Sequence, residues 1–220
     1  MPLLVLASAS PRRRELLALG GWAFDLRPVD VAETPLAAEN PADFVRRLSG
    51  AKARAAAEGV DSGALIIGAD TTVVVEGQML NKPAGAPQAA AMLARLRGRT
   101  HEVLTAITVL DTATHHLHTD LARSRVPMRA YGDDEIRAYV ATGDALDKAG
   151  AYAIQHPGFQ PVDRERFADC FANVMGLPLC HLLRRLRRLG VEPDADLPAA
   201  CQAFIPYQCP VSEAILREEV

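Results

Sequence analysis

The fold is decided by residues 3–17, LLVLASASPRRRELL, in which an apolar run leads through a short polar turn into a helical pattern. The apolar run at 3–7 predicts a buried strand. Ser10 is a good N-cap and Pro11 a good first helical residue, so we expect a helix that begins at Pro11 and is closed by Gly20-Gly21. A strand that leads directly into a helix is typical of an α/β fold.

The first turn of this helix carries Arg12, Arg13 and Arg14, at the positive end of the helix dipole. Each misplaced charge there costs about 0.3–1 kcal/mol, so the arrangement suggests a bound anion. Free backbone N–H groups together with guanidinium groups make a phosphate site. The alternative is surface charge in a chain with 21 arginines, as we expect for Arg184 and Arg185 near the end of a later helix.

Strands and helices alternate along the rest of the first hundred residues, which predicts an α/β architecture. The further strands are predicted at 24–29, 64–69, 73–76, 78–80, 101–110, 116–129 and 151–155, and the helices at 86–96, 133–141, 177–189 and after Asn40. The pair 101–110 and 116–129 is expected to be antiparallel. In the long helix after Asn40, the expected buried stripe is Phe44, Leu48, Ala51 and Ala55.

Length and charge set the class of protein. A chain of 220 residues is expected to form one large domain or two intimately joined lobes. Its net charge of −3 argues against general nucleic-acid binding. The apolar start is too short to span a membrane, and positive charges follow it rather than precede it. We therefore expect a cytoplasmic protein that binds neither nucleic acid nor membrane.

The four cysteines all lie in the last quarter of the chain, with no C-x-x-C pair: Cys170, Cys180, Cys201 and Cys209. This pattern predicts reduced, structural thiols, and a metal site at Cys201 and Cys209 is the less favoured alternative. Residues 191–200 are expected to be a linker to a short tail. Apolar residues of that tail, such as Phe204, Tyr207 and Ile215, would pack on the body of the protein or on a second subunit.

The three lysines stand out in a chain that nearly always uses arginine: Lys52, Lys82 and Lys148. A compact ammonium group on a flexible stem differs from a guanidinium fork and is a common partner of phosphate. Chance is the alternative explanation for so small a number.

Two carboxylates are candidates for metal binding or proton transfer. Asp70 ends the apolar run 64–69, and the carboxyl end of a central strand is where open α/β sheets usually bind ligands. Glu33 lies in a predicted loop. Two hard oxygen ligands and substrate phosphates are the usual way to hold Mg²⁺. The alternative for Asp70 is a turn cap.

Other candidates are weaker. His116 and His118 would share one face of a strand, where an exposed strand start is favoured over a metal site. Asp144 and Asp147 beside Lys148 could form only a polar turn. Neither of the two common glycine-rich phosphate loops occurs, and no arrangement identifies a serine or cysteine nucleophile.

Several ordered blocks resemble the Maf family of nucleoside triphosphate pyrophosphatases. The resemblance runs from about residue 3 to 189 and rests on the blocks 6–13, 68–71, 82–83, 147–152 with Gln155, and 173–179. It implies a domain at 1–190, with 191–220 as an extension of unknown role. The implied fold is that of the inosine triphosphatases: an elongated mixed sheet flanked by helices, with two lobes and a central cleft.

The implied reaction is hydrolysis of a nucleoside triphosphate, dTTP or UTP or a modified pyrimidine nucleotide, to the monophosphate and pyrophosphate. It would use Mg²⁺ or Mn²⁺, and the protein would be a homodimer. The resemblance assigns the following site residues: Asp70, Glu33 and Lys82 as catalytic, Asp70 and Glu33 also as metal ligands, and Ser8, Arg12, Arg13, Lys52, Thr71, Lys148 and Gln155 as substrate ligands. Arg14 receives no role.

The sequence departs from the family pattern at Asn81, at 156–161 and at 168–172, which are expected near the base pocket. The base preference therefore stays open, with 7-methyl-GTP as an alternative substrate. A second alternative is a nucleotide-binding regulator with weak catalysis, linked to septum formation. The presence of both Asp70 and Glu33 favours an enzyme, because pure phosphate binding gains nothing from nearby carboxylates.

Overall fold

Two long neighbouring strands form the centre of the sheet in the computed structural model, which describes residues 2–218. Across the sheet, the strands are β2 (Phe24–Leu26), β1 (Leu4–Leu6), β3 (Leu65–Val75), β5 (Thr100–Asp111) and β6 (Leu117–Pro127), and β4 (Gln78–Leu80) also pairs with β3. The β2–β1–β3 pairings are parallel, and all the others are antiparallel. The predicted α/β fold with a mixed sheet is confirmed.

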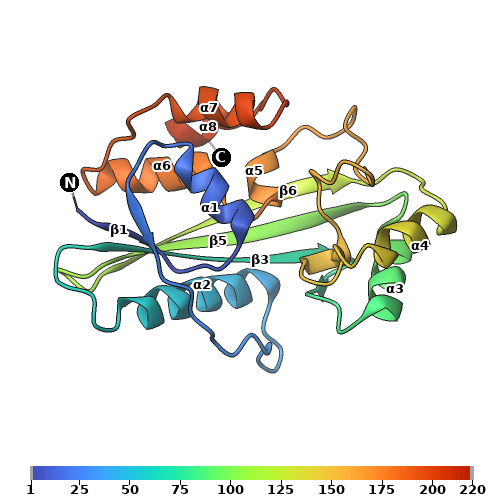
Figure 1. The fold of residues 1–220 in the computed structure, drawn as a ribbon, viewed down its shortest axis with the longest axis horizontal. Helices are drawn as coiled ribbons and strands as arrows, with labels where there is room; N and C mark the ends of the chain where they lie inside the picture. The colour runs from blue at the N-terminus through green and yellow to red at the C-terminus, as the bar shows by residue number, and fades with distance from the viewer. Residues whose placement is uncertain (1, 219–220) are drawn as a thin grey trace.

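Helices cover both faces of this sheet in an elongated molecule (Figure 1). α2 lies on one face against β3 and β5, whereas α1, α6, α7 and α8 gather on the other. α3 and α4 stand at the end of the sheet where β3 finishes. The helices are α1 (Pro11–Ala18), α2 (Pro41–Ala57), α3 (Ala86–Leu96), α4 (Asp133–Ala141), α5 (Phe171–Val174), α6 (Leu179–Arg188), α7 (Leu197–Phe204) and α8 (Ser212–Arg217).

The opening segment folds as predicted. β1 is fully buried, and α1 begins at Pro11 with Ser10 in the N-cap position. The Ser10 side chain makes no capping bond, however, and its backbone N–H donates to the Ser8 hydroxyl at 3.2 Å. The turn between β1 and α1 is therefore organised around Ser8.

The two predicted strands at 64–69 and 73–76 are one continuous strand, β3, so the expectation that Asp70 ends a strand is wrong. Asp70 lies in the middle of β3. One edge of β3 pairs with β1 at 65–67 and with β4 at 73–75. Between these pairings, no strand within residues 2–218 covers that edge. Asp70 and Thr71 lie in this gap, just past the carboxyl end of parallel β1, where ligand sites of α/β sheets are found.

In the second half of helix α2, the buried positions are shifted by one residue from the predicted stripe. Phe44 and Leu48 are buried as expected, but Ala51 and Ala55 are only half-buried. The reason lies in β3, because a Cβ on Gly68 would lie 2.2 Å from the Ser49 carbonyl oxygen. The backbones of α2 and β3 thus meet at Gly68, and this contact turns Lys52 toward the sheet.

The strand predicted at 151–155 is also wrong. Residues Ala149–Ala151 form a 3-10 turn, η1, and the chain continues as a loop. Gly150 and Ala151 have φ values of 70° and 60°, which a strand cannot accommodate. The apolar residues here reflect burial rather than strand structure, since Tyr152 and Ile154 are buried.

The C-terminal segment contains more structure than a linker and a tail. Asp194 N–H donates to the Gly20 carbonyl, and the Trp22 indole donates to the Glu192 carbonyl at 2.9 Å. Residues 191–196 are therefore docked on the end of α1, and α7 begins at Leu197 inside the predicted linker. Tyr207 and Ile215 pack on the body of the protein, whereas Phe204 is exposed.

Candidate active site

A cleft of about 810 Å³ lies over the uncovered edge of β3. All ten residues that the sequence proposes for the site line it: Ser8, Arg12, Arg13, Glu33, Lys52, Asp70, Thr71, Lys82, Lys148 and Gln155. They come from the β1–α1 turn, the first turn of helix α1, the loop after β2, helix α2, strand β3, the loop after β4 and the segment around η1. The structure brings these residues together, while their individual roles stay predictions.

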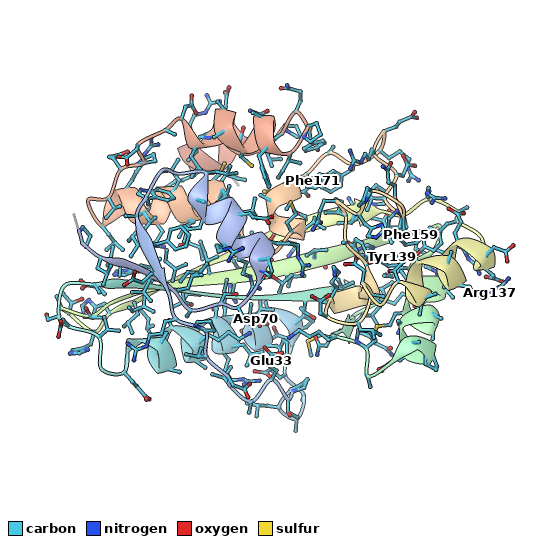
Figure 2. The ribbon with its side chains drawn as sticks, in the orientation of Figure 1. Glu33, Asp70, Arg137, Tyr139, Phe159 and Phe171 are labelled. Carbon is cyan, nitrogen blue, oxygen red and sulfur yellow. The ribbon has the colours of Figure 1, made fainter. Side chains whose placement is uncertain are left out.

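Lys52 joins the two carboxylates. Its Nζ donates to Glu33 Oε1 at 2.6 Å and to Asp70 Oδ1 at 2.6 Å. The side chains of Lys52 and Asp70 are 10% and 8% exposed, so this ion pair is largely removed from water, whereas the Glu33 side chain is 39% exposed. Figure 2 shows Asp70 and Glu33 close together beside α2. The two carboxylate oxygens thus converge on one point.

The pKa values of the two carboxyl groups are shifted in opposite directions. Burial raises the pKa of Asp70, and the charges of Lys52 and Arg13 only partly offset this. Burial alone would raise the pKa of Glu33 as well, but its hydrogen bonds to Lys52 and Lys82 outweigh burial and lower it. Asp70 is therefore the better proton acceptor of the pair, and Glu33 is the more firmly ionised.

The Glu33 loop is held on α2 by Arg47. Arg47 Nε and Nη2 donate to the Glu39 carboxylate at 2.6 and 2.7 Å, and Nη2 also donates to the Thr34 carbonyl at 3.2 Å. The sequence analysis missed this residue, because an arginine inside a polar helix pattern looks like a solvated charge. A bidentate pair of this kind fixes geometry as well as charge.

Arg13 is the most constrained of the three arginines. It donates to the Gly176 carbonyl at 2.8 Å, to the Thr71 hydroxyl at 3.1 Å and to the Ser8 hydroxyl at 3.4 Å. Burial lowers its pKa, but an arginine stays protonated in this setting. Arg13 therefore places a fixed positive charge in the wall of the cleft.

Arg12 and Arg14 differ from Arg13 and from each other. Arg12 lines the cleft and is half-buried, and within residues 2–218 its guanidinium has no ion-pair partner. Arg14 is exposed and does not line the cleft. Of the three arginines in the first turn of α1, Arg13 is thus held by protein groups, Arg12 can meet a ligand in the cleft, and Arg14 lies on the surface.

Lys148 is buried among acidic groups. Its Nζ donates to Asp147 at 2.6 Å, to Asp144 at 2.9 Å and to the Asp144 carbonyl, and its side chain is 7% exposed. The polar turn that was an alternative for Asp144 and Asp147 is present, and Lys148 is part of it. Gln155 lies half-buried on the same side of the cleft.

Apolar side chains complete the cleft between the charged groups and η1. Val73, Val103, Tyr152 and Met175 line it. Tyr152 is held by a hydrogen bond of 2.8 Å to His101 Nε2. The sequence analysis did not select these residues, since buried apolar positions look alike in a sequence.

Of the three departures from the family pattern, only Asn81 lines the cleft. Its side-chain oxygen accepts from the Thr72 hydroxyl at 2.8 Å. None of the residues 156–161 and 168–172 lines the cleft. His156 and Phe159 instead pack against Tyr139, with ring centroids 4.9 and 4.5 Å apart, and Cys170 begins α5.

No cluster of metal-binding side chains is evident in the described part of the chain. Within residues 2–218, no group of three or more His, Cys, Asp or Glu side chains is arranged to hold a metal ion. The His116 and His118 rings contact each other at 6.4 Å, as on a strand start. No helix in the same range is long and apolar enough to cross a membrane.

Comparisons with known proteins identify the family. Residues 3–189 match the family described as Maf-like protein. The chain is 47% identical over 200 residues to a dTTP/UTP pyrophosphatase of Anaeromyxobacter dehalogenans, covering 90% of this chain and 99% of that protein. It is 46% identical over 187 residues to a dTTP/UTP pyrophosphatase of Geobacter sulfurreducens, covering 85% and 96%. Among solved structures, the Staphylococcus aureus Ham1 protein has a TM-score of 0.46 at 14% identity, covering 76% of this chain and 80% of that one. This chain belongs to the Maf family.

Proposed function

We propose that this protein hydrolyses nucleoside triphosphates, dTTP and UTP above all, to the nucleoside monophosphate and pyrophosphate. The observation that carries the proposal is the convergence of Asp70 and Glu33 on Lys52 inside a cleft that also holds Arg12, Arg13 and Lys82. Two carboxylates among several cations suit a substrate that is itself highly anionic. Two relatives of this chain are dTTP/UTP pyrophosphatases, which supports the proposal.

The basic side chains divide the work of holding the triphosphate. Arg13 provides a fixed charge beside the Ser8 hydroxyl, and Arg12 and Lys82 are the more exposed cations. The Lys82 side chain is 57% exposed, and within residues 2–218 its ammonium group pairs only with Glu33, at 3.1 Å. These cations would carry the charge that grows on the departing pyrophosphate. Lys148 already faces Asp144 and Asp147, so we place it near the nucleoside rather than on a phosphate.

Glu33 and Asp70 fit a divalent cation, Mg²⁺ or Mn²⁺. Both oxygens lie 2.6 Å from one nitrogen, so they already face a common cationic centre. Mg²⁺ is usually held by one or two carboxylates, waters and substrate phosphates, which this pair would satisfy. When bound, the ion would neutralise phosphate charge and orient the scissile group.

Asp70 is the proposed proton acceptor. A water molecule attacks the α-phosphorus, a new P–O bond forms, and the bond from the α-phosphorus to the bridging oxygen breaks as pyrophosphate leaves. Asp70 takes the proton of the water, and its raised pKa makes it a better base than an exposed carboxylate. Lys52 positions Asp70 by holding Oδ1.

The base preference is proposed from Gln155, Thr71 and Arg12, which all line the cleft. Gln155 offers an amide that can both donate to and accept from a pyrimidine edge. The Thr71 hydroxyl is already bonded to Arg13 and Thr105, so it acts by placing Arg13. Arg12 would contribute to base choice as well as to phosphate binding.

A hydrolysis screen tests the proposal. Canonical and modified nucleoside triphosphates, including 7-methyl-GTP, are incubated with Mg²⁺ or Mn²⁺, and pyrophosphate and phosphate are measured separately. We expect pyrophosphate, with dTTP and UTP turned over fastest. Tight nucleotide binding without turnover would instead favour a regulator, and a preference for 7-methyl-GTP would move the protein to that substrate.

We also propose a homodimer in the cytoplasm. Leu26 is 45% exposed in β2, the edge strand of the sheet, and an exposed apolar residue at an edge favours a partner. Four free thiols suit a reducing compartment. Light scattering after size exclusion tests the dimer, and the mass of a single chain would contradict it.

A further inference from the structure

The four cysteines, which the proposed reaction does not use, gather at one place. Cys170, Cys180, Cys201 and Cys209 all line a small apolar cavity of about 20 Å³ between α5, α6 and the C-terminal segment. Cys201 and Cys209 lie beyond the family match at 3–189, so this arrangement depends on an extension outside the matched region. Scattered in sequence, the thiols are neighbours in space.

Cys170 and Cys209 interact directly, and they differ in accessibility. Cys170 is buried, whereas Cys209 is half-buried. The hydrogen bond between their thiols is the largest cause of opposite pKa shifts: it raises the pKa of Cys170 and lowers the pKa of Cys209. One thiol is thus reactive and reachable, and its neighbour is protected, which is the arrangement of an attacking and a resolving cysteine.

The C-terminal segment is fixed against Cys170 by contacts that do not involve sulfur. Tyr207 accepts from the Asp169 backbone N–H and donates to the Phe167 carbonyl, both at 3.1 Å. Its ring also packs against Phe167 and Phe171, at 5.3 and 5.7 Å. The two thiols are therefore held together before any bond forms.

We propose that Cys170 and Cys209 form an oxidisable dithiol, a thiol–disulfide site that hydrogen peroxide closes and a thiol reductant opens. The Cys209 thiolate attacks the peroxide: an S–O bond forms, the O–O bond breaks, and the leaving hydroxide takes up a proton to become water. The Cys170 thiol then attacks the resulting sulfenic sulfur, loses its proton, and releases a second water as the S–S bond forms. Two thiols are oxidised and one peroxide is reduced to two waters.

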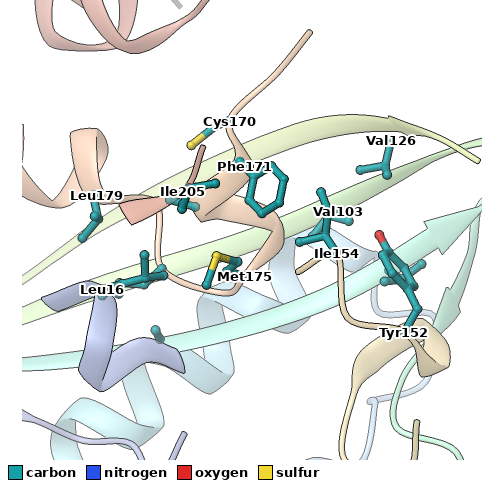
Figure 3. Close-up of a cluster of buried hydrophobic side chains, with 14 of the residues drawn as sticks. Leu16, Val103, Val126, Tyr152, Ile154, Cys170, Phe171, Met175, Leu179 and Ile205 are labelled. Carbon is teal, nitrogen blue, oxygen red and sulfur yellow. The ribbon is translucent and has the colours of Figure 1, made fainter. Parts of the chain in front are cut away.

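The site lies at one end of a short helix whose other end reaches the cleft. Cys170 is the N-cap of α5, and its sulfur accepts from the Asn173 N–H at 3.4 Å (Figure 3). After α5, Met175 and Gly176 line the cleft, and the Gly176 carbonyl holds Arg13 at 2.8 Å. Asn173 also accepts from the Thr105 hydroxyl, which is bonded to Thr71. Oxidation at Cys170 therefore acts on the elements that position Arg13.

Thiol counting on the full-length protein tests the site itself. The reduced protein is treated with hydrogen peroxide, its free thiols are counted, and the linked peptides are mapped by mass spectrometry. We expect a drop from four thiols to two, with Cys170 linked to Cys209, restored to four by dithiothreitol. Cys209→Ser should not form this link, whereas Cys201→Ser, the matched control, should form it as the wild type does.

Several results would overturn the dithiol. They are an unchanged count of four thiols, a disulfide between another pair of cysteines, or overoxidation of Cys209 without a disulfide. A zinc ion bound at one per chain in the wild type and lost in Cys201→Ser would also overturn the proposal. Cys209→Ala provides a second variant with the same expectation if Cys209→Ser does not fold.

The effect on the cleft rests on the proposed function and has its own measurement. We expect the KM for UTP to change about fivefold or more on oxidation, the low end of usual coupling between sites, in the wild type and not in Cys209→Ser. An oxidised wild type with an unchanged KM would contradict the coupling, whatever the thiol count. A protein that hydrolyses no nucleotide would remove the proposed function and leave the thiol result to be judged alone.

Discussion

Two charge clusters lie on opposite sides of the sheet, and they differ in whether they border a cavity. In the cleft, Lys52 bridges Glu33 and Asp70. On the far side, Asp120 of β6 is held by Arg184 and Arg185 of α6 at 3.2 and 2.7 Å, with all three side chains 10–16% exposed. The first cluster lines a cavity of about 810 Å³, and the second does not.

The two clusters differ in the direction in which the pKa of their aspartate is shifted. Burial would raise the pKa of Asp120, but its hydrogen bonds to Arg185 and Arg184 outweigh burial and lower it. Burial prevails at Asp70 and raises its pKa. A buried carboxylate whose hydrogen bonds and ion pairs outweigh the cost of burial has a structural role. A carboxylate beside a cavity whose burial is only partly offset is a candidate for catalysis. The sequence analysis interpreted Arg184 and Arg185 as surface charges near the end of a helix. They instead form a structural ion-pair cluster with Asp120.

The largest expected effect is on turnover in Asp70→Asn. Loss of the proton acceptor should reduce kcat by about 10²–10⁴-fold. The folded state should survive, because the ionised Asp70 is itself unfavourably buried. Steady-state pyrophosphate release and circular dichroism measure the two properties. Near-normal kcat in a folded variant would remove Asp70 from the mechanism.

Asp120→Asn is the matched change in the second cluster and should behave in the opposite way. It leaves Arg184 and Arg185 facing each other without a carboxylate, which should reduce the free energy of unfolding by about 1–3 kcal/mol. Because the cluster lies away from the cleft, kcat should stay near the wild-type value. Urea denaturation measures the free energy of unfolding. A variant as stable as the wild type would show that the Asp120 cluster does not stabilise the fold.

A third change tests how the cleft cluster is positioned. Gly68→Ala places a methyl group against the Ser49 carbonyl, so α2 must move away from β3. We expect a loss of about 1–3 kcal/mol and a lower kcat, because Lys52 moves with the helix. Gly50→Ala on the same helix meets only the end of the Arg54 side chain at 3.4 Å, and should instead stabilise the protein by about 0.5–1 kcal/mol. Equal stabilities of the two variants in urea would contradict this packing.

The smallest expected effect is in the pH dependence of stability. For Asp120, whose folded pKa lies below the ordinary 3.8, the stabilisation is present above that value and lost as pH falls through the folded pKa. For Asp70, whose folded pKa lies above 3.8, the favourable contribution is present below that value and lost as pH rises through the folded pKa. The Tm difference between wild type and Asp120→Asn should therefore shrink below about pH 4, while Asp70→Asn should gain on the wild type as pH rises. Parallel Tm curves would contradict the opposite shifts.

The sequence predicts the opening strand and helix because residues 3–17 contain both an apolar run and helix-start signals. It does not predict that Asp70 lies inside β3, since the gap in pairing depends on where β1 and β4 end. The strand at 151–155 fails because left-handed backbone at Gly150 and Ala151 is invisible in an apolar pattern. The site residues could be selected by motif, but the bridge through Lys52 depends on the close approach at Gly68.

In the proposed mechanism, water attacks the α-phosphorus in the cleft cluster. Hydrolysis of UTP in ¹⁸O-labelled water, followed by mass spectrometry of both products, shows where the water oxygen goes. We expect one ¹⁸O atom in UMP and none in pyrophosphate. Label in pyrophosphate, or release of orthophosphate in its place, would contradict it.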